Sequence, residues 1–339
     1  MRNGTPMDNP SPGSKDFEIE SRIVRYQDLA PCRDAFIDTR SPGSDQKENF
    51  TIIGPGVSEN RNQFVHVSEP HGFNIGGARQ PPRCLNSQHS HETVEVFYVH
   101  SGRWRFMTGE HGEDGDVRLE PGDLISIPTR LFRGFENVGS DTGFLWAVLG
   151  GDDPGRVLWA PYVFEMAKSF GLILLENGAL IDSTKGEQAP AGARPMPATT
   201  PEQVAELRRA DSSALEQCVS RARAPRPPGI FPGAAGVSER LLVGAPPLDW
   251  AHGFTIVEST IEHGAAIKDH ILDVSDVWFI QSGRVEVSID GVSAVCGPGD
   301  TVTVPKGVLR RLRTLEGEAA IVAQVRGGDT LPRPSLPEI

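Results

Sequence analysis

Cysteine is scarce in this chain of 339 residues, which contains Cys32, Cys84, Cys218 and Cys296 and no CxxC pair. Neither a disulfide framework nor a thiolate zinc site is therefore expected. Long hydrophobic runs are also missing. The first residues, MRNGTPMDNPSPGSKD, lack the apolar core of a secretory signal, and runs such as FGLILLENGALI are far shorter than a membrane span. We expect a cytoplasmic protein with no membrane contact.

Positive charge is in deficit as well. The chain has 33 Lys and Arg against 45 Asp and Glu, a formal net charge of -12, and no cluster of Lys and Arg stands out. A protein with this charge is repelled by a phosphate backbone. Nucleic acid is therefore not expected as a partner.

Turn-forming residues, in contrast, are abundant. The chain contains 37 Gly and 28 Pro, which separate short apolar runs such as DLISIP and TVTVP. This pattern is typical of many short strands and not of long helices. The chain is therefore predicted to be all-β.

The sequence repeats itself. HGFNI at 71–75 recurs as HGFTI at 252–256, and EVFYVHSGRWRF recurs as DVWFIQSGRVEV 181 residues later. LEPGDLISIPTRLFR at 119–133 recurs as CGPGDTVTVPKGVLR 177 residues later, which indicates a shorter hairpin in the second copy. Two similar β modules, at about 45–165 and 235–330, are therefore predicted, and a jelly-roll barrel buries one face of so many short strands economically.

This organisation suggests four segments. Residues 1–17 are polar and rich in Pro, Gly and Ser, which predicts disorder. Residues 18–183 and 235–339 are expected to form the N-terminal and C-terminal domains, joined by a linker at 184–234. Within the linker, Thr200 before Pro201 predicts one short helix, and a second is expected to start at Asp211 or Ser212.

A possible metal site lies in CLNSQHSHETVEVFYVHSG, residues 84–102. If this stretch is extended, His89, His91 and Glu95 all lie on the same face, because side chains of a strand alternate with a period of two. Three metal-ligating side chains would then converge.

These residues give the chain its resemblance to a known family. It resembles the cupin superfamily, and specifically the bicupins, whose first motif is matched by His89, His91, Glu95 and Gly102, and whose second motif is matched by Gly122, Pro128 and Asn137. Arg130 stands where the second motif has glycine, and Arg133 stands where it has the last histidine ligand. In size and organisation, the chain looks most like the ring-cleaving dioxygenases of the gentisate and homogentisate type.

Arg133 changes the chemistry that the resemblance implies, because a guanidinium has no lone pair to offer a metal. Two imidazoles and a carboxylate remain, the ligand set of non-haem Fe(II) oxygenases, so Fe(II) is the expected metal and Mn, Ni or Zn would accept the same ligands. If Arg133 enters the barrel, it can clamp a small anionic substrate. Alternatively, Arg133 forms an ion pair with Glu95 and the metal has been lost.

The second module retains fewer of these residues. His270 replaces His89, Leu272 replaces His91, Asp276 replaces Glu95, and Arg310 replaces Arg133. One imidazole and one carboxylate do not make a metal site, so the second module is expected to have a structural role. It is expected to pack against the first module or against its copy in a homodimer.

The sequence therefore predicts a metal-dependent dioxygenase that acts on a small anionic substrate, with aromatic acids among the candidates. One alternative is a redox-neutral isomerase, cyclase or lyase that uses the same metal as a Lewis acid. Another is a metal-free protein that binds a small acid through Arg133 and Arg130. His71 is a further candidate for the site, although its repeat copy, His252, favours a structural role.

Overall fold

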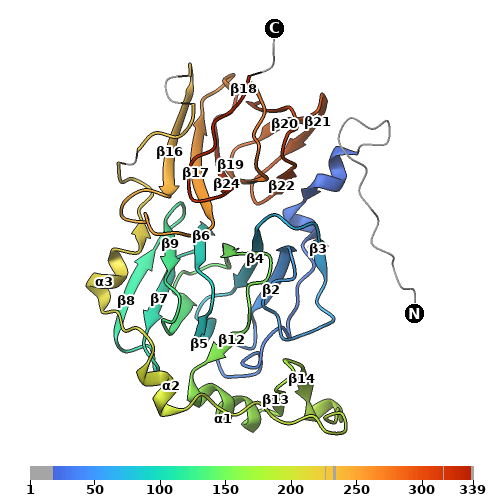
Figure 1. The fold of residues 1–339 in the computed structure, drawn as a ribbon, viewed down its shortest axis with the longest axis vertical. Helices are drawn as coiled ribbons and strands as arrows, with labels where there is room; N and C mark the ends of the chain where they lie inside the picture. Colours follow the sequence, from blue (N-terminus) through green and yellow to red (C-terminus); the bar gives the residue numbers. More distant parts are fainter. Residues whose placement is uncertain (1–17, 226, 232–233, 316, 337–339) are drawn as a thin grey trace. The chain divides into compact units, whose positions relative to one another are not determined.

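The computed structural model describes residues 18–225, 227–231, 234–315 and 317–336. The expected disorder of residues 1–17 concerns a segment outside this range. Strands dominate the chain, and the all-β prediction is confirmed (Figure 1). The chain forms two compact units: the first comprises Ala30–Ala224 and Pro246–Asp249, and the second comprises residues 18–29, 225–245 and 250–336.

The first unit contains a jelly-roll barrel made of two antiparallel sheets, here called the first barrel. The larger sheet has the order β15-β9-β6-β11-β4-β2-β3. Its strands are β2 (Glu48–Ile53), β3 (Val65–Val67), β4 (Phe73–Gln80), β6 (Glu95–Ser101), β9 (Leu124–Ile127), β11 (Gly143–Gly150) and β15 (Val219–Ser220). The smaller sheet, in the order β12-β5-β10-β7-β8, consists of β5 (Leu85–His91), β7 (Trp104–Thr108), β8 (Gly115–Leu119), β10 (Arg133–Asn137) and β12 (Val157–Trp159). Only β2 and β3 pair in parallel.

The remaining elements of the first unit are short. They are α1 (Pro161–Ser169), β13 (Leu172–Leu174), β14 (Leu180–Asp182), a 3-10 turn at Ser183–Lys185, α2 (Pro201–Ala205) and α3 (Ser212–Glu216). The two linker helices are confirmed. Thr200 and Gln203 form a capping box around the start of α2, and Asp211 caps α3 by accepting from the backbone N–H of Ala214.

The second unit contains a barrel, here called the second barrel, whose strands follow the same order but which lacks counterparts of β3 and β12 among the described residues. Its larger sheet has the order β1-β22-β19-β24-β17-β16, and its smaller sheet β18-β23-β20-β21. The strands are β1 (Ile23–Val24), β16 (Val237–Val243), β17 (Phe254–Ile261), β18 (Ala266–His270), β19 (Asp276–Ser282), β20 (Val285–Ile289), β21 (Val292–Cys296), β22 (Thr301–Val304), β23 (Arg310–Thr314) and β24 (Ala320–Gly327). Two 3-10 turns, Ile19–Arg22 and Tyr26–Asp28, flank β1.

Turns explain the change in spacing between the two copies. Residues 109–114 connect β7 to β8, whereas Asp290 and Gly291 alone connect β20 to β21. Both residues of this tight turn have positive φ, 50° and 82°, as a two-residue hairpin of type I′ requires. The shorter hairpin expected in the second copy is therefore confirmed.

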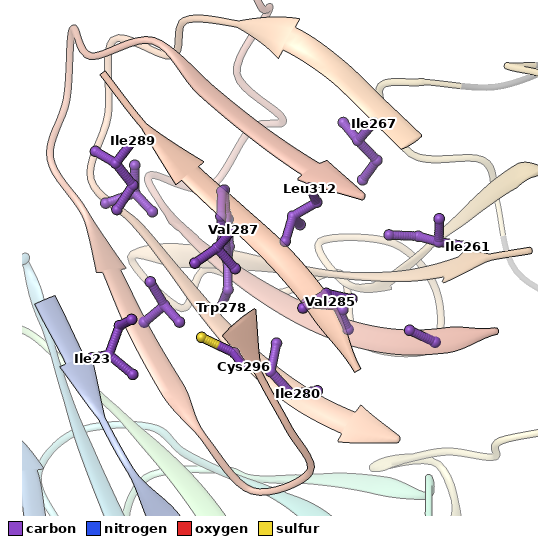
Figure 2. Close-up of a cluster of buried hydrophobic side chains, with 14 of the residues drawn as sticks. Ile23, Ile261, Ile267, Trp278, Ile280, Val285, Val287, Ile289, Cys296 and Leu312 are labelled. Atoms are coloured by element: carbon purple, nitrogen blue, oxygen red, sulfur yellow. The ribbon is translucent and has the colours of Figure 1, made fainter. Parts of the chain in front are cut away.

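Apolar side chains fill the second barrel between its two sheets. Trp278, Val287 and Leu312 are fully buried, and Ile23 from β1 joins the same cluster. Figure 2 shows these side chains gathered between strands that lie far apart in the sequence. A segment from the beginning of the chain therefore completes a core that is otherwise built from its end.

Each barrel receives one edge strand from a distant segment. β1 pairs with β22, and β15 pairs with β9. Both segments also bind the aspartate of the neighbouring PGD turn: Arg25 donates to Asp300 at 3.1 Å, and Arg221 donates to Asp123 at 3.0 Å. The sequence analysis placed residues 18–29 with the N-terminal domain and 184–224 in the linker, whereas the structure places 18–29 in the second unit and 184–224 in the first. Strands of two residues carry no periodic signal that could have indicated this.

None of the helices in the described part of the chain is long and apolar enough to cross a membrane.

Candidate metal centre

Two histidines and a glutamate meet in the first barrel, although they do not lie on one strand. His89 and His91 lie at the end of β5 in the smaller sheet, and Glu95 begins β6 in the larger sheet. The chain bends through residues 92–94, so the expectation of one continuous extended segment is wrong at this point. The bend brings the end of one sheet to the start of the other, and the three side chains still converge.

The distances between these side chains suit a metal. The candidate ligand atoms of His89, His91 and Glu95 all lie within 4.8 Å of one another, and Nε2 of His91 is 3.5 Å from Oε2 of Glu95. Ligands about 2.1 Å from a shared metal lie roughly 3.0–3.5 Å apart, so only small adjustments are needed. In the described part of the chain, this is the one group of at least three His, Cys, Asp or Glu that could hold an ion.

Hydrogen bonding leaves ring nitrogens available. Nδ1 of His89 lies 2.7 Å from the carbonyl oxygen of Ser87, so it carries the proton, and Nε2 retains its lone pair. The ring nitrogens of His91 make no hydrogen bond of ordinary geometry to the described residues, although the nearby Arg156 backbone opposes the lowering of the His91 pKa. Trp159 packs on the ring of His89 with 5.1 Å between the centroids, and its Nε1 donates to Glu59 at 2.7 Å. The His89 ring is therefore held in place by contacts that leave Nε2 free.

Burial and charge keep both imidazoles neutral. Burial, reinforced by the Arg133 guanidinium, lowers the pKa of His89 well below its usual value, and the same two causes lower the pKa of His91. Burial raises the pKa of Glu95, and Arg133 opposes this rise. A neutral imidazole is the form that binds metals.

Arg133, on β10, is bound to the candidate ligands themselves. One of its Nη atoms forms an ion pair with Oε2 of Glu95, and the other donates to the carbonyl oxygen of His89 at 2.9 Å. The side chain is 1% exposed and is not among the residues that line the adjacent cavity. The substrate clamp expected from the sequence needs the guanidinium to face that cavity, whereas in the structure it faces Glu95. The ion pair that was the alternative is therefore present.

A cavity of about 70 Å³ lies beside the three candidate ligands, and all three contribute to its wall. Aromatic and aliphatic side chains, including Phe50, Phe97, Phe135, Ile75 and Leu149, form much of the remaining wall. Benzene occupies a protein cavity of about 150 Å³, so an aromatic ring would require this one to expand. In this conformation, the cavity fits a molecule of a few non-hydrogen atoms.

Other residues singled out in the sequence lie elsewhere. His71 and His252 are equivalent: each Nδ1 contacts the carbonyl oxygen two residues before it, at 2.7 Å and 2.5 Å. Neither residue lines the cavity. The Arg130 side chain is 56% exposed and pairs with Glu206, so it is not placed to hold a small acid in the barrel. Arg130 does keep the positive φ, 61°, of the motif glycine that it replaces.

The sequence analysis missed polar side chains that line the cavity together with the candidate ligands. Asn49 and Thr51, on alternate positions of β2, line it, and so does Gln63 from the loop that follows β2. The alternation in ENFTII could have indicated that Asn49 and Thr51 share a face. No motif or repeat marks these positions.

The corresponding position of the second barrel is occupied by buried charged side chains. His270, Asp276 and Arg310 are buried there, and Leu272 stands where a second histidine ligand would be needed. Arg310 and Arg326 approach the Asp276 carboxylate from two sides, at 3.6 Å and 3.7 Å. Guanidinium groups thus surround the carboxylate of the second barrel.

The residues of the first barrel fit a divalent metal. Nε2 of His89 is free, the ring nitrogens of His91 make no hydrogen bond of ordinary geometry to the described residues, and Glu95 supplies a carboxylate. Nitrogen and oxygen donors of this kind suit Fe(II), Mn(II), Ni(II) and Zn(II). Arg133 does not prevent binding, because it occupies one oxygen of a carboxylate that has several acceptor positions.

Comparison with known proteins adds the following. Residues 77–148 match the cupin domain family. No curated protein matches the chain. Among solved structures, vicilin from Capsicum annuum is similar over 93% of this chain and 88% of its own, with 13% sequence identity and a TM-score of 0.60.

Two oxalate decarboxylases are similar as well. The Lactobacillus farciminis enzyme in complex with formate has 12% identity and a TM-score of 0.58, over 91% of this chain and 87% of its own. A Bacillus subtilis oxalate decarboxylase structure, described with Mn(II) centres, has 13% identity and a TM-score of 0.57, over 91% of this chain and 78% of its own. At these identities the likeness shows the fold alone.

Proposed function

We propose that this chain, which contains a cupin domain and has the bicupin fold, is a metal-dependent enzyme that acts on a small anionic substrate. His89, His91 and Glu95 hold one divalent metal, Fe(II) or Mn(II), in the first barrel. The second barrel holds none and has a structural role.

The charge balance of the cavity carries this proposal. Glu95 is the only acidic side chain in its wall, and Arg133 already pairs with it. A divalent cation therefore adds two positive charges that no other wall residue offsets. An uncompensated charge in a buried site is costly, so an anionic ligand stabilises the loaded site.

The bound metal would supply Lewis acidity and, if redox-active, electrons for oxygen chemistry. The protein side chains have distinct tasks around it. Ser87 and Trp159 orient His89, Arg133 orients Glu95, and the phenylalanine rings of the wall keep bulk water out. Arg133 thus acts on the substrate through Glu95 and through its charge, and not by direct contact.

Two reaction classes use the same residues. The ligand set favours the oxygen-dependent reaction, a dioxygenase. The small cavity and the likeness to the two oxalate decarboxylases favour a redox-neutral cleavage of a short-chain acid. The substrates that distinguish them are aromatic acids and acids of two to four carbon atoms.

Metal analysis followed by two assays tests the proposal. Protein purified without added metal is expected to contain close to one Fe or Mn per chain. With a panel of short aliphatic acids, oxalate included, and aromatic acids, oxygen uptake identifies a dioxygenase, and carbon dioxide release without oxygen uptake identifies a lyase. A chelator-treated sample serves as the control and should lose turnover. Protein that takes up no divalent metal contradicts the proposal.

A further inference from the structure

We propose that Asn49 donates a hydrogen bond to the ligand of the first barrel, and that this ligand is a carboxylate of two to four carbon atoms. The inference rests on the proposed function, because it concerns the same cavity. It adds a residue that determines which ligands bind, on the wall formed by β2.

The amide of Asn49 has no protein partner. Asn49 is 7% exposed and lines the cavity together with the three candidate metal ligands. Its Nδ2 makes no hydrogen bond to any described residue and is itself covered by neighbouring atoms, so a turn of the amide group is needed to present this donor to the cavity. Leaving a buried donor unsatisfied costs about 1–3 kcal/mol, so this amide is expected to meet a polar group that occupies the cavity.

The second barrel shows which side chains contact the equivalent position there. Asn49 pairs with Ala78 across β2 and β4, and Glu239 pairs with Ser259 in the same way across β16 and β17. Asn49 and Glu239 are therefore equivalent. Oε1 of Glu239 accepts a hydrogen bond from Ser259 at 2.8 Å and lies 3.8 Å from Arg326. The equivalent position of the second barrel is thus engaged by protein side chains.

Glu239 also accepts from the backbone N–H of Phe231, but the three side chains that contact it are each replaced by an apolar residue in the first barrel. The strand register aligns Ser259 with Ala78, Gln324 with Ala147, and Arg326 with Leu149. Ala147 and Leu149 line the cavity, as does Ala78. Three smaller or apolar side chains therefore open the space that the polar network fills in the second barrel, and they leave Asn49 without the partners that its counterpart has.

The chemistry of the opposed walls defines the ligand class. Nδ2 of Asn49 is a donor, so the group that meets it carries an acceptor oxygen. Arg133 already balances the negative charge of Glu95. A bound divalent metal therefore needs a negatively charged oxygen from the ligand. A cavity of about 70 Å³ is roughly half of one that holds benzene, so the two oxygen functions belong to a short aliphatic molecule.

Calorimetric titration of Mn(II)-loaded protein with acetate, glycolate, pyruvate and malonate tests this inference. The unmodified chain is expected to bind at least one of these acids. Asn49→Leu, which keeps the branched shape and removes the donor, should weaken that binding about tenfold or more. Asn49→Asp should weaken it further by repulsion. The metal content of both variants should equal that of the unmodified chain.

Two further variants complete the experiment. Asn177→Leu, at an exposed asparagine, is the matched control and should bind the acid normally. Ala147→Gln introduces the residue found in the second barrel and should block the acid while keeping the metal, which separates loss of the cavity from loss of the fold.

The outcomes distinguish the two proposals. Acid binding by Asn49→Leu within twofold of the unmodified chain overturns the role of Asn49. A metal-loaded chain that binds none of the four acids overturns the ligand class. If the chain binds no Mn(II), the proposed function fails, and titration of the metal-free protein and its Asn49→Leu variant still decides whether Asn49 binds an acid.

Discussion

The first barrel encloses a cavity of about 70 Å³ beside two histidines and a glutamate, whereas the equivalent positions of the second barrel hold charged side chains that contact one another. The strand orders match, and the register of the key pair is the same: Arg133 lies opposite His89, and Arg310 lies opposite His270. The difference therefore comes from side chains and not from the fold.

The comparison shows two ways of balancing a buried carboxylate in one fold. Asp276 has two arginines, Arg310 and Arg326, whereas Glu95 has Arg133 alone, because Leu149 stands where Arg326 stands in the second barrel. The second barrel thus supplies all of its positive charge from the protein. The first barrel leaves space and donors for a cation from solution.

The largest effect is expected when a histidine of the first barrel is removed. His91→Ala should abolish stoichiometric metal binding, because it removes one of three ligands, and even outer-shell changes cost 10–100-fold in affinity. His270→Ala in the second barrel is the matched control and should leave the metal content unchanged. Metal analysis of the two purified variants decides the matter, and equal loss in both would place the metal elsewhere.

The second barrel should respond in stability and not in metal content. Asp276→Ala leaves Arg310 and Arg326 buried without their shared carboxylate, which should lower the free energy of unfolding by about 3–5 kcal/mol. Chemical denaturation measures this. Glu318→Ala, which removes the partner of Arg284 in an exposed ion pair, should leave the free energy of unfolding almost unchanged. Similar losses in both variants would contradict a buried charge network.

A smaller effect should show what Arg133 does. If it holds Glu95 in place, Arg133→Gln should weaken metal affinity about 10–100-fold, as for other residues that orient a ligand. If it clamps substrate directly, as expected from the sequence, the same variant should keep its metal affinity and lose affinity for the acid alone. Competition with a fluorescent chelator measures the metal affinity, and Arg310→Gln in the second barrel is the control.

Sequence reasoning predicted the two modules and the three candidate ligands because each depends on a short local pattern, a repeated segment or a fixed spacing of residues. The repeated PGD turn requires a positive φ, and Gly122 and Gly299 have φ of 86° and 87°. The histidines of β5 share a strand face for the same reason of periodicity. Constraints of this kind depend on a few adjacent residues, so they can be recognised in the sequence.

What the sequence did not reveal depends on residues far apart in the chain. The ion pair of Arg133 with Glu95 was one of two arrangements left open, and only the packing of β10 against β5 selects it. The equivalence of Asn49 and Glu239 follows only from the pairing of β2 with β4 and of β16 with β17, which the sequence does not show. A cavity is the space left between side chains from several strands, so no single segment of the sequence can predict it.

The two edge strands from distant segments, β1 and β15, affect how the chain folds during synthesis. Ile23 pairs with Val302, so the first strand of the second barrel leaves the ribosome long before its partner exists. The first barrel must likewise wait for Val219 to reach Ile125 after most of its own strands are complete. During synthesis, β1 has no partner until β22 is made, and the edge of β9 stays open to other strands until β15 is made. All strands of the first barrel lie within residues 48–220, whereas the second barrel also needs β1, so a gene cut between β15 and β16 would deprive only the second barrel of a strand.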